Sequence, residues 1–312
     1  MAIARVSKRR TRKNNQTQAN IARQVGSNTK VRDFFVMYYG QGKSITSDDV
    51  IQVANQLKTY VKVPKEKLTI DLIIHSWGGD AYSAFKIVKT IRSYCSQLNI
   101  IVPIRAVSAG TLISLGGDKI YLGPQSQLGP LDAPTEHPTI QENSVSSIDC
   151  VNSIAYVEGV LKSVASNRYI ELRNEIGLGR KDAITIAYSI ANEFTRTLVE
   201  KLDPIQSSKS SRDLEIALTY GEELLNDHMF SNEAQKGKKS KSVIRSLVYG
   251  YPAHGFAICY DEAKKIGLMV SQSSDYPDWE GVWEFINKLI VTHREDKLLW
   301  HLTNEQFLPW SK

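Results

Sequence analysis

The sequence predicts an α/β fold with a mainly parallel sheet in its first part and a largely helical second part. Between residues 34 and 122, short apolar runs alternate with amphipathic stretches of helical period. Strands that alternate with helices indicate parallel pairing through helical crossovers. After Asp132 the pattern becomes helical, and 42% hydrophobic residues in a chain of 312 suffice for one sizeable core.

Each element of the first part has a local reason. The cluster Thr46-Ser47-Asp48-Asp49 is typical of a helix start, because short oxygen-bearing side chains accept hydrogen bonds from free helical amides. Val50, Val53 and Leu57 then share one helical face. The expected strands are 34–39, 68–76, 100–107 and 119–122, and the expected helices begin near 46, 80 and 108 and run to about 57, 98 and 115.

The second part is predicted from apolar periodicity and from charge. Helices are expected at 153–166, 182–202, 214–225, 242–247 and 261–267, with a charged loop at 231–242 and a return strand at 251–258. Aromatic and aliphatic residues at helical spacing predict one more helix in the C-terminal stretch. The domain organisation predicted is a basic tail (1–32), one α/β domain (33–272) and a C-terminal helical extension (273–312).

Two motifs follow predicted strands and carry candidate chemistry. In the first, HSWGGD, Gly78 and Gly79 can turn backbone N–H groups outward toward a substrate oxygen. In the second, VSAGT, Ser108 stands at a strand-to-helix turn, with the N–H of Ala109 beside it. One nucleophile and a set of amide donors would converge there.

Either motif alone fits an ordinary tight turn, since small residues recur where strands meet helices. Together, each at the carboxyl end of a parallel strand, they favour a site, because open α/β sheets bind ligands at that edge. We expect His75 to orient the glycine turn from behind and Asp80 to cap the following helix.

The chain resembles the Clp and signal peptide peptidase A superfamily of serine proteases, and most closely its serine dehydrogenase proteinase branch. The pieces that carry the resemblance are FFVMYYG with ITSDDV, IHSWGGD, SAGTLISLGGDKIYLGPQSQLGPLDAP, and YPAHGFAI with DEAKKIGL. They run from Phe34 to Leu268, and residues 140–245 match only loosely. The resemblance implies a Clp/crotonase-like spiral of ββα units.

The resemblance also implies roles for the turn residues. Gly78, Gly79 and Ala109 correspond to the oxyanion site, and Gly110 to a substrate contact. Ser76-Trp77 stands where the family usually has a small residue and a proline before its glycines, so Trp77 is a departure. We expect its ring either to fill a substrate subsite or to pack against the body.

The general base has two candidates. Peptidases of the signal peptide peptidase A type pair the serine with a lysine 40 to 55 residues later, which selects Lys162 by resemblance. Its alternative is a surface lysine whose stem covers an apolar face. His254, within YPAHGFAI, is the competing base and would otherwise fix the following strand through a backbone hydrogen bond.

The function that these observations predict is a serine endopeptidase without a cofactor. Ser108 would form an acyl-enzyme with peptides or with unfolded or membrane-derived segments. A catalytically inactive oligomeric scaffold or binding module is the main alternative, with Trp77 obstructing the oxyanion site. A crotonase-type acyl-CoA enzyme is a weaker one, since no acyl-CoA handle is visible.

Charge and composition set the expected partners. The first 30 residues hold 8 Lys or Arg and no acid, so the formal charge of +6 resides in this tail, and the remainder has 31 basic and 33 acidic residues. The tail is expected to be a solvated arm, with an acidic partner or nucleic acid as the alternative. Three scattered cysteines predict neither disulfides nor zinc. Without a signal-peptide core or membrane span, a soluble cytoplasmic protein is expected. The apolar helices after Asp132 need further surface to pack on, and the resemblance implies assembly, so a closed homo-oligomer is expected.

Overall fold

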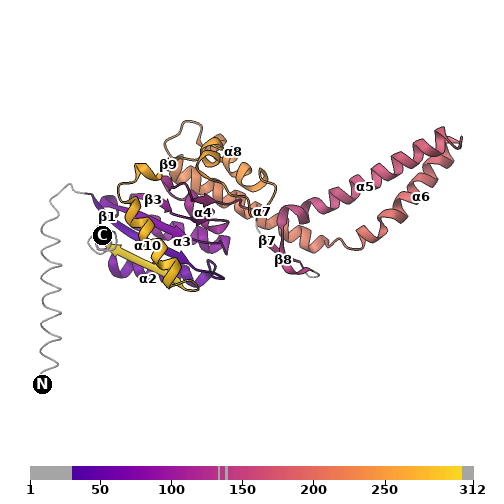
Figure 1. Cartoon of the computed structure of the whole chain (residues 1–312). Helices are drawn as coiled ribbons and strands as arrows, with labels where there is room; N and C mark the ends of the chain where they lie inside the picture. Colours follow the sequence, from indigo (N-terminus) through magenta and orange to yellow (C-terminus); the bar gives the residue numbers. More distant parts are fainter. Residues whose placement is uncertain (1–29, 133, 138–139, 304–312) are drawn as a thin grey trace, which may run out of the picture.

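The computed structural model describes residues 30–132, 134–137 and 140–303. The predicted basic tail therefore lies almost wholly outside the described residues. The described chain forms a layered α/β body with a long helical arm that projects from one side of it (Figure 1). No helix in the described ranges is both long and apolar enough to cross a membrane.

A six-stranded sheet forms the centre of the body, in the order β10-β1-β2-β3-β5-β9. Every neighbouring pair is parallel except β1 and β10, which are antiparallel. The sheet strands are β1 (Val31–Tyr39), β2 (Leu68–His75), β3 (Gln97–Val102), β5 (Lys119–Leu122), β9 (Val270–Gln272) and β10 (Lys297–Thr303). A small second sheet joins β4 (Arg105–Ala106) to β6 (Gln127–Leu128).

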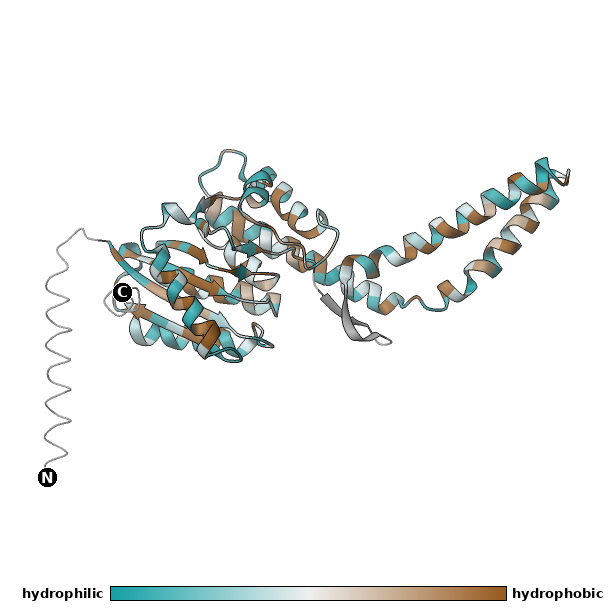
Figure 2. Cartoon of the chain, in the orientation of Figure 1, coloured by the Kyte–Doolittle hydropathy of each residue, from teal (hydrophilic) through white to brown (hydrophobic). Residues whose placement is uncertain are grey.

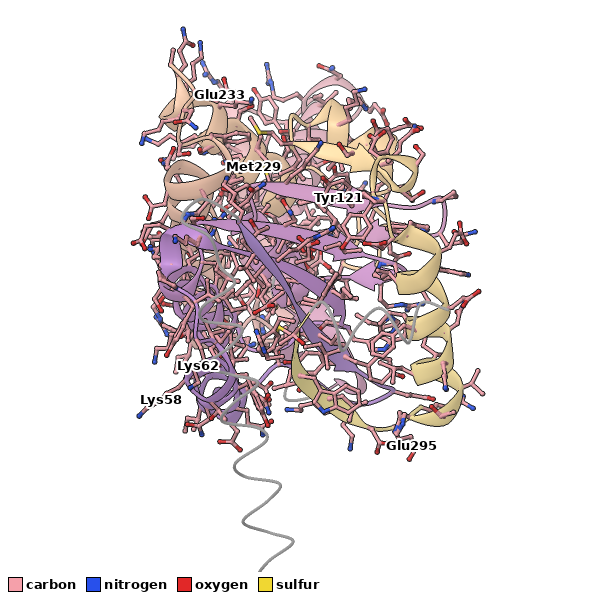
Figure 3. The ribbon with its side chains drawn as sticks, turned by 90° about the vertical axis from the view of Figure 1, so that its left-hand side faces the viewer. Lys58, Lys62, Tyr121, Met229, Glu233 and Glu295 are labelled. Atoms are coloured by element: carbon pink, nitrogen blue, oxygen red, sulfur yellow. The ribbon has the colours of Figure 1, made fainter. Side chains whose placement is uncertain are left out.

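Helices cover both faces of the main sheet, which explains why every residue of β2 and the last seven residues of β1 are buried. Phe35 of β1 faces the first layer, which contains α2 (Ser47–Tyr60), α3 (Ala81–Tyr94) and α4 (Ala109–Leu115). Phe34 faces the second layer, formed by α10 (Trp279–Thr292). Figure 3 shows these layers on the two sides of the strands, with Lys58, Lys62 and Glu295 at the periphery.

The helix starts follow the predicted cap chemistry. Thr46 and Asp49 form a reciprocal capping box at the start of α2. Asp80 caps α3 by accepting a hydrogen bond of 2.8 Å from the N–H of Ser83, as expected. These caps fix where the chain leaves the carboxyl edge of the sheet and turns back along its face.

The second part of the chain contains the projecting arm. It is a hairpin of α5 (Ser147–Asn174) and α6 (Arg180–Val199), preceded by β7 (Pro134–His137) and β8 (Ile140–Ser146). The arm returns to the body through α7 (Pro204–Leu224), a π-helical turn η2 (Leu225–Met229) and α8 (Lys236–Tyr249). α6 can lie close to α5 because its buried residues are small. These residues are Ala183, Ala187, Ala191 and Thr195. Figure 2 shows apolar residues continuing along the arm.

The α/β class with a helical second part is confirmed, whereas several element predictions are wrong. Residues 251–258 form a turn in which only Ile258 makes an isolated bridge, to Leu128. α8 begins at Lys236, inside the stretch predicted as a charged loop. The described part of the C-terminal extension is not wholly helical: α10 is its one α-helix, and its last described residues form edge strand β10. The remaining short helices are η1 (Lys65–Lys67), α9 (Tyr260–Lys265) and η3 (Ser273–Asp275).

Candidate active site

Ser108 occupies a strained turn between β4 and α4. Its backbone has φ 51° and ψ −118°, and it is the one non-glycine residue with positive φ in the described chain. Such a conformation costs a residue with a Cβ about 1–3 kcal/mol and persists only where the surrounding structure enforces it. The turn is the structural form of the strand-to-helix junction predicted from VSAGT.

The glycine turn packs directly against this serine. Gly78 and Gly79 have φ values of 112° and 144°. A Cβ on Gly78 would lie 2.8 Å from the Ser108 Cβ, and one on Gly79 would lie 2.4 Å from the backbone of Ile45. Both positions therefore require glycine for conformation and for space. The two predicted motifs, about 30 residues apart in sequence, meet here.

The amides around Ser108 differ in availability. The Gly78 N–H donates to Ser76 Oγ at 3.1 Å, and the Gly110 N–H donates to the Val107 carbonyl at 2.9 Å. Within the described residues, the amides of Gly79 and Ala109 have no recorded hydrogen bond. Ala109 begins α4, where an amide has no acceptor in its own helix. Gly79 and Ala109 are thus the amides free to hold a substrate oxygen.

Thr111 locks the turn, and the sequence analysis did not identify it. Its Oγ1 donates to the Ala106 carbonyl at 2.8 Å and lies 2.9 Å from the Gly129 carbonyl. The same oxygen accepts the Gly129 N–H at 2.9 Å. This buried hydroxyl ties α4 to β4 and to the segment after β6. A threonine three residues after a candidate nucleophile, on the buried face of a short helix, was the available signal.

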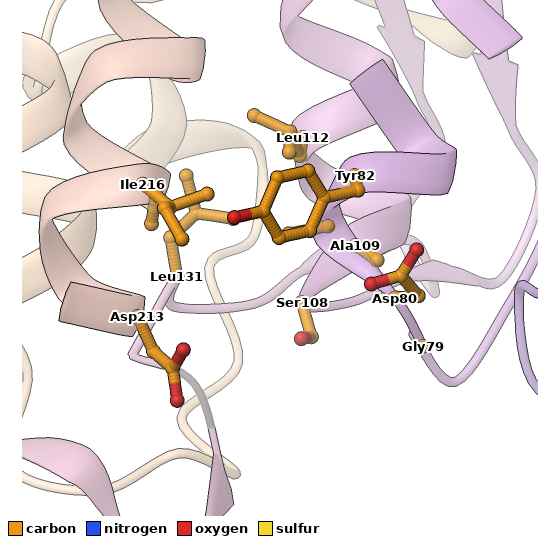
Figure 4. A pocket seen from close by; sticks show the side chains of 11 residues that line it. Gly79, Asp80, Tyr82, Ser108, Ala109, Leu112, Leu131, Asp213 and Ile216 are labelled. Atoms are coloured by element: carbon orange, nitrogen blue, oxygen red, sulfur yellow. The ribbon is translucent and has the colours of Figure 1, made fainter. Parts of the chain in front are cut away.

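A cavity of about 230 Å³ opens at Ser108. Figure 4 shows the Ser108 hydroxyl and the Asp213 carboxylate on the same side of the cavity, with the Tyr82 ring extending toward Ile216. Apolar groups from α4 and α7 complete the wall. The lining residues are Gly79, Asp80, Ala81, Tyr82, Ser108, Ala109, Leu112, Leu131, Asp213, Ile216 and Ala217.

Three other predicted residues lie around the turn and outside this cavity. His75 is buried and stacks on Tyr38, with ring centroids 5.3 Å apart, and burial lowers its pKa to about 4. Trp77 is half exposed and stacks on Arg105. Gly110 is buried against Ser76, where its lack of a side chain lets α4 approach. It supports the turn and does not line the cavity.

The structure does not place Lys162 at Ser108. Lys162 is 15 residues beyond the start of α5, about 22 Å along the projecting arm. Its side chain is 67% exposed and pairs with Glu158 at 2.5 Å. The hydrogen bond that Lys162 donates to Glu158 raises the pKa of Lys162, whereas a lysine base needs burial that lowers it. The predicted pairing is corrected accordingly: the projecting arm carries Lys162 away from the cavity.

His254 has the surroundings of a base. Its Nδ1 lies 3.0 Å from Oδ1 of Asp132, a carboxylate that also accepts the Ser146 hydroxyl at 2.8 Å. The hydrogen bond to Asp132 raises the pKa of His254 above its ordinary value of 6.5. Asp132 directly follows Leu131, which lines the cavity at Ser108. His254 itself is not among the lining residues.

A nucleophilic side chain at a strained strand-to-helix turn, next to amides without a partner among the described residues, is an arrangement that could carry out serine-dependent acyl transfer. Residues 13–152 match the family described as ClpP-like SDH-type serine proteinase. The resemblance predicted from the sequence is thereby confirmed, and both turn motifs fall within the matched residues.

Curated relatives match over a shorter segment. Two uncharacterized proteins of Methanocaldococcus jannaschii are 39% and 31% identical over 90 residues, which are 29% of this chain. The matched segment spans 30% of the length of each relative.

Among solved structures, ClpP1 from Listeria monocytogenes is 13% identical, with a TM-score of 0.34 over 77% of this chain and 91% of that one. A variant of the 1510-N membrane-bound stomatin-specific protease is 18% identical, with a TM-score of 0.31 over 50% of this chain and 69% of that one.

Proposed function

We propose that this protein is a serine peptidase that cleaves polypeptides through an acyl-enzyme at Ser108. The observation that supports this best is the strained Ser108 turn beside two amides that have no hydrogen-bond partner among the described residues, in a segment that matches a serine proteinase family. The substrates are peptides or unfolded segments, because the cavity of about 230 Å³ accepts a side chain and not a folded surface.

In this mechanism the Ser108 hydroxyl attacks the carbonyl carbon of the scissile bond. The developing oxyanion accepts hydrogen bonds from the amides of Gly79 and Ala109, which are fixed before the reaction. Collapse of the tetrahedral intermediate expels the amine and leaves an ester on Ser108. Water then repeats the sequence and releases the acid. The apolar wall from α4 and α7 receives the side chain of the acyl residue.

We propose His254 as the general base, oriented by Asp132. The hydroxyl proton passes to the imidazole on attack and from the imidazole to the leaving amine. Asp132 supports this role because a buried carboxylate stabilises the imidazolium that forms. Lys162 does not fit, since its exposed ammonium is held charged by Glu158.

The proposal is tested with a fluorophosphonate probe and peptide digestion read by mass spectrometry. Wild-type protein should be labelled at Ser108 and should release fragments, and Ser108→Ala should do neither. Ser93→Ala is the matched control, because Ser93 is an exposed serine on α3. If wild-type protein is not labelled at Ser108, the chain is instead a non-catalytic binding module of this fold.

A further inference from the structure

Arg105 is a cation that lies close in sequence to the candidate nucleophile. It stands in β4, three residues before Ser108, and is half-buried. Within the described chain it has no carboxylate partner, and its Nε is buried without a hydrogen bond. By contrast, each of three other cations held against the sheet contacts a carboxylate. These cations are Arg32, Arg92 and Lys297. Arg105 is therefore held at the sheet edge with its charge uncompensated.

The Trp77 ring packs against this guanidinium. The Cζ atom of Arg105 lies 3.7 Å from the centroid of the Trp77 ring. A ring over one face of a guanidinium leaves its in-plane N–H donors available to a planar partner. Because Nε is buried, the two terminal NH₂ groups are the donors that a ligand from solvent would meet. Trp77 is itself 50% exposed, so ligands can reach the pair from solvent.

His75 adds a buried polar group to the surroundings of Arg105. Its Nδ1 is buried without a partner, and the residue is 5% exposed. Burial and the charge of Arg105 together lower the pKa of His75 to about 4, so the ring is neutral at neutral pH. No carboxylate is recorded in contact with either side chain within the described residues. The electrostatic complement of this cluster is an anion.

Trp77 and Arg105 both lie near Ser108 in the structure or in the chain. Trp77 directly precedes Gly78, where an added Cβ would lie 2.8 Å from the Cβ of Ser108. Arg105 is three residues before Ser108, and three residues of fully extended backbone span about 10 Å, which is the upper limit of their separation along the chain. A peptide bound at Ser108 spans that distance in about three residues.

We propose that Arg105 and Trp77 form a subsite that binds a carboxylate of the peptide substrate, within about three residues of the bond attacked by Ser108. The carboxylate belongs either to an acidic side chain or to the C-terminus of the peptide, and the guanidinium edge pairs with its two oxygens. This inference rests on the proposed peptidase function, whose substrate class it narrows.

The test measures binding of fluorescein-labelled peptides to the Ser108→Ala variant, with Glu or Gln scanned through each position and with free or amidated C-termini. Charge-assisted pairing predicts about tenfold or more tighter binding for Glu or for the free terminus. Arg105→Gln should abolish that preference, and raised ionic strength should weaken it. A preference for internal Glu identifies a side chain, and one confined to free termini identifies the peptide end.

Controls separate the subsite from general effects of charge and folding. Arg245→Gln removes an arginine near Tyr249, 5.9 Å from its ring centroid, and should leave the preference intact. Trp77→Leu should reduce the preference while Arg105 keeps its charge. If Arg105→Gln fails to fold, Arg105→Lys retains the charge without the planar edge and should lose most of the preference.

Equal binding of Glu and Gln peptides with either terminus, or a preference that survives Arg105→Gln, would overturn the subsite. Fluorophosphonate labelling keeps the two proposals distinguishable. Labelling at Ser108 with no carboxylate preference leaves the peptidase standing and rejects the subsite. A carboxylate preference in a protein that the probe does not label leaves the subsite and rejects the peptidase.

Discussion

At most positions alanine makes a protein more stable than glycine does, and the backbone conformation at Ser108 reverses this order. At φ 51° and ψ −118° any Cβ is strained, so Ser108→Ala keeps the strain and Ser108→Gly releases it. We expect Ser108→Gly to be about 1 kcal/mol more stable than Ser108→Ala, and both to be inactive. Denaturant unfolding of the two variants measures this difference.

Ser163 supplies the matched comparison. It is an exposed serine within α5, where glycine costs about 1 kcal/mol relative to alanine. There we expect Gly to be the less stable of the pair. If the alanine variant is more stable than the glycine variant at both positions, the Ser108 turn is not strained in solution.

The base is tested through pH. Because Asp132 raises the pKa of His254, kcat/KM should rise with pH through a midpoint above 6.5 as the imidazole loses its proton. Asp132→Asn should move that midpoint downward, and His254→Ala should remove activity. Lys162→Ala should behave like wild type. Loss of activity in Lys162→Ala, with a normal profile in His254→Ala, would restore the lysine as the base.

The same pair also makes stability depend on pH. A histidine whose folded pKa is raised contributes stability that is present in full below its unfolded pKa and is lost as pH rises through its folded pKa. The destabilisation caused by His254→Ala should therefore be larger at about pH 5.5 than at about pH 9. Melting temperatures of wild type and variant at the two pH values give the comparison.

At the scale of elements, β10 is fixed to the body by a buried charge. Lys297 Nζ lies 2.9 Å from Oδ1 of Asp49, whose side chain is inaccessible to solvent, and Tyr39 donates to the same carboxylate at 3.0 Å. Lys297→Ala would leave Asp49 buried with only neutral donors. We expect a loss of about 2–3 kcal/mol of unfolding free energy.

An exposed lysine provides the control for this prediction. Lys265 pairs with Glu262 and its side chain is 76% exposed, so Lys265→Ala should change stability by less than about 0.5 kcal/mol. Equal effects of the two lysine variants in urea unfolding would show that Asp49 is solvated and that β10 is only loosely docked.

An element of the fold was predictable from the sequence where the residues that determine it are neighbours in the chain. Thr46 and Asp49 predicted the start of α2, and Asp80 predicted the start of α3, because a cap uses only neighbouring atoms. β10 was predicted as helix. Its residues pair with β1, more than 250 residues earlier, and that pairing overrides their helical spacing.

At the scale of the whole molecule, the α5–α6 arm presents apolar side chains to solvent. Tyr156, Ile176, Ile190 and Phe194 are 69%, 61%, 40% and 62% exposed. A monomer seldom leaves such a surface uncovered, so self-association stays our prediction. The aromatic C-terminal stretch is a poor place to test it, because α10 and β10 are built into the body.

Light scattering at several concentrations should give a mass above the 35.0 kDa of one chain. The double variant Ile190→Glu with Phe194→Glu should lower that mass while far-UV circular dichroism stays unchanged, since both side chains face solvent. Arg196→Glu, which changes charge on the same helix without removing apolar surface, is the control. A mass near 35.0 kDa at every concentration would refute assembly.

The sequence by itself determined the α/β class, the two turn motifs and Ser108 as the candidate nucleophile. These depend on periodicity and on glycine and serine at strand ends, which are properties of neighbouring residues. The tertiary structure decided which amides stay free, that Lys162 lies out on the arm, and that His254 meets Asp132 across 122 positions. The direction of a helix in space and the meeting of distant loops depend on packing of the whole core, which no short window of sequence contains.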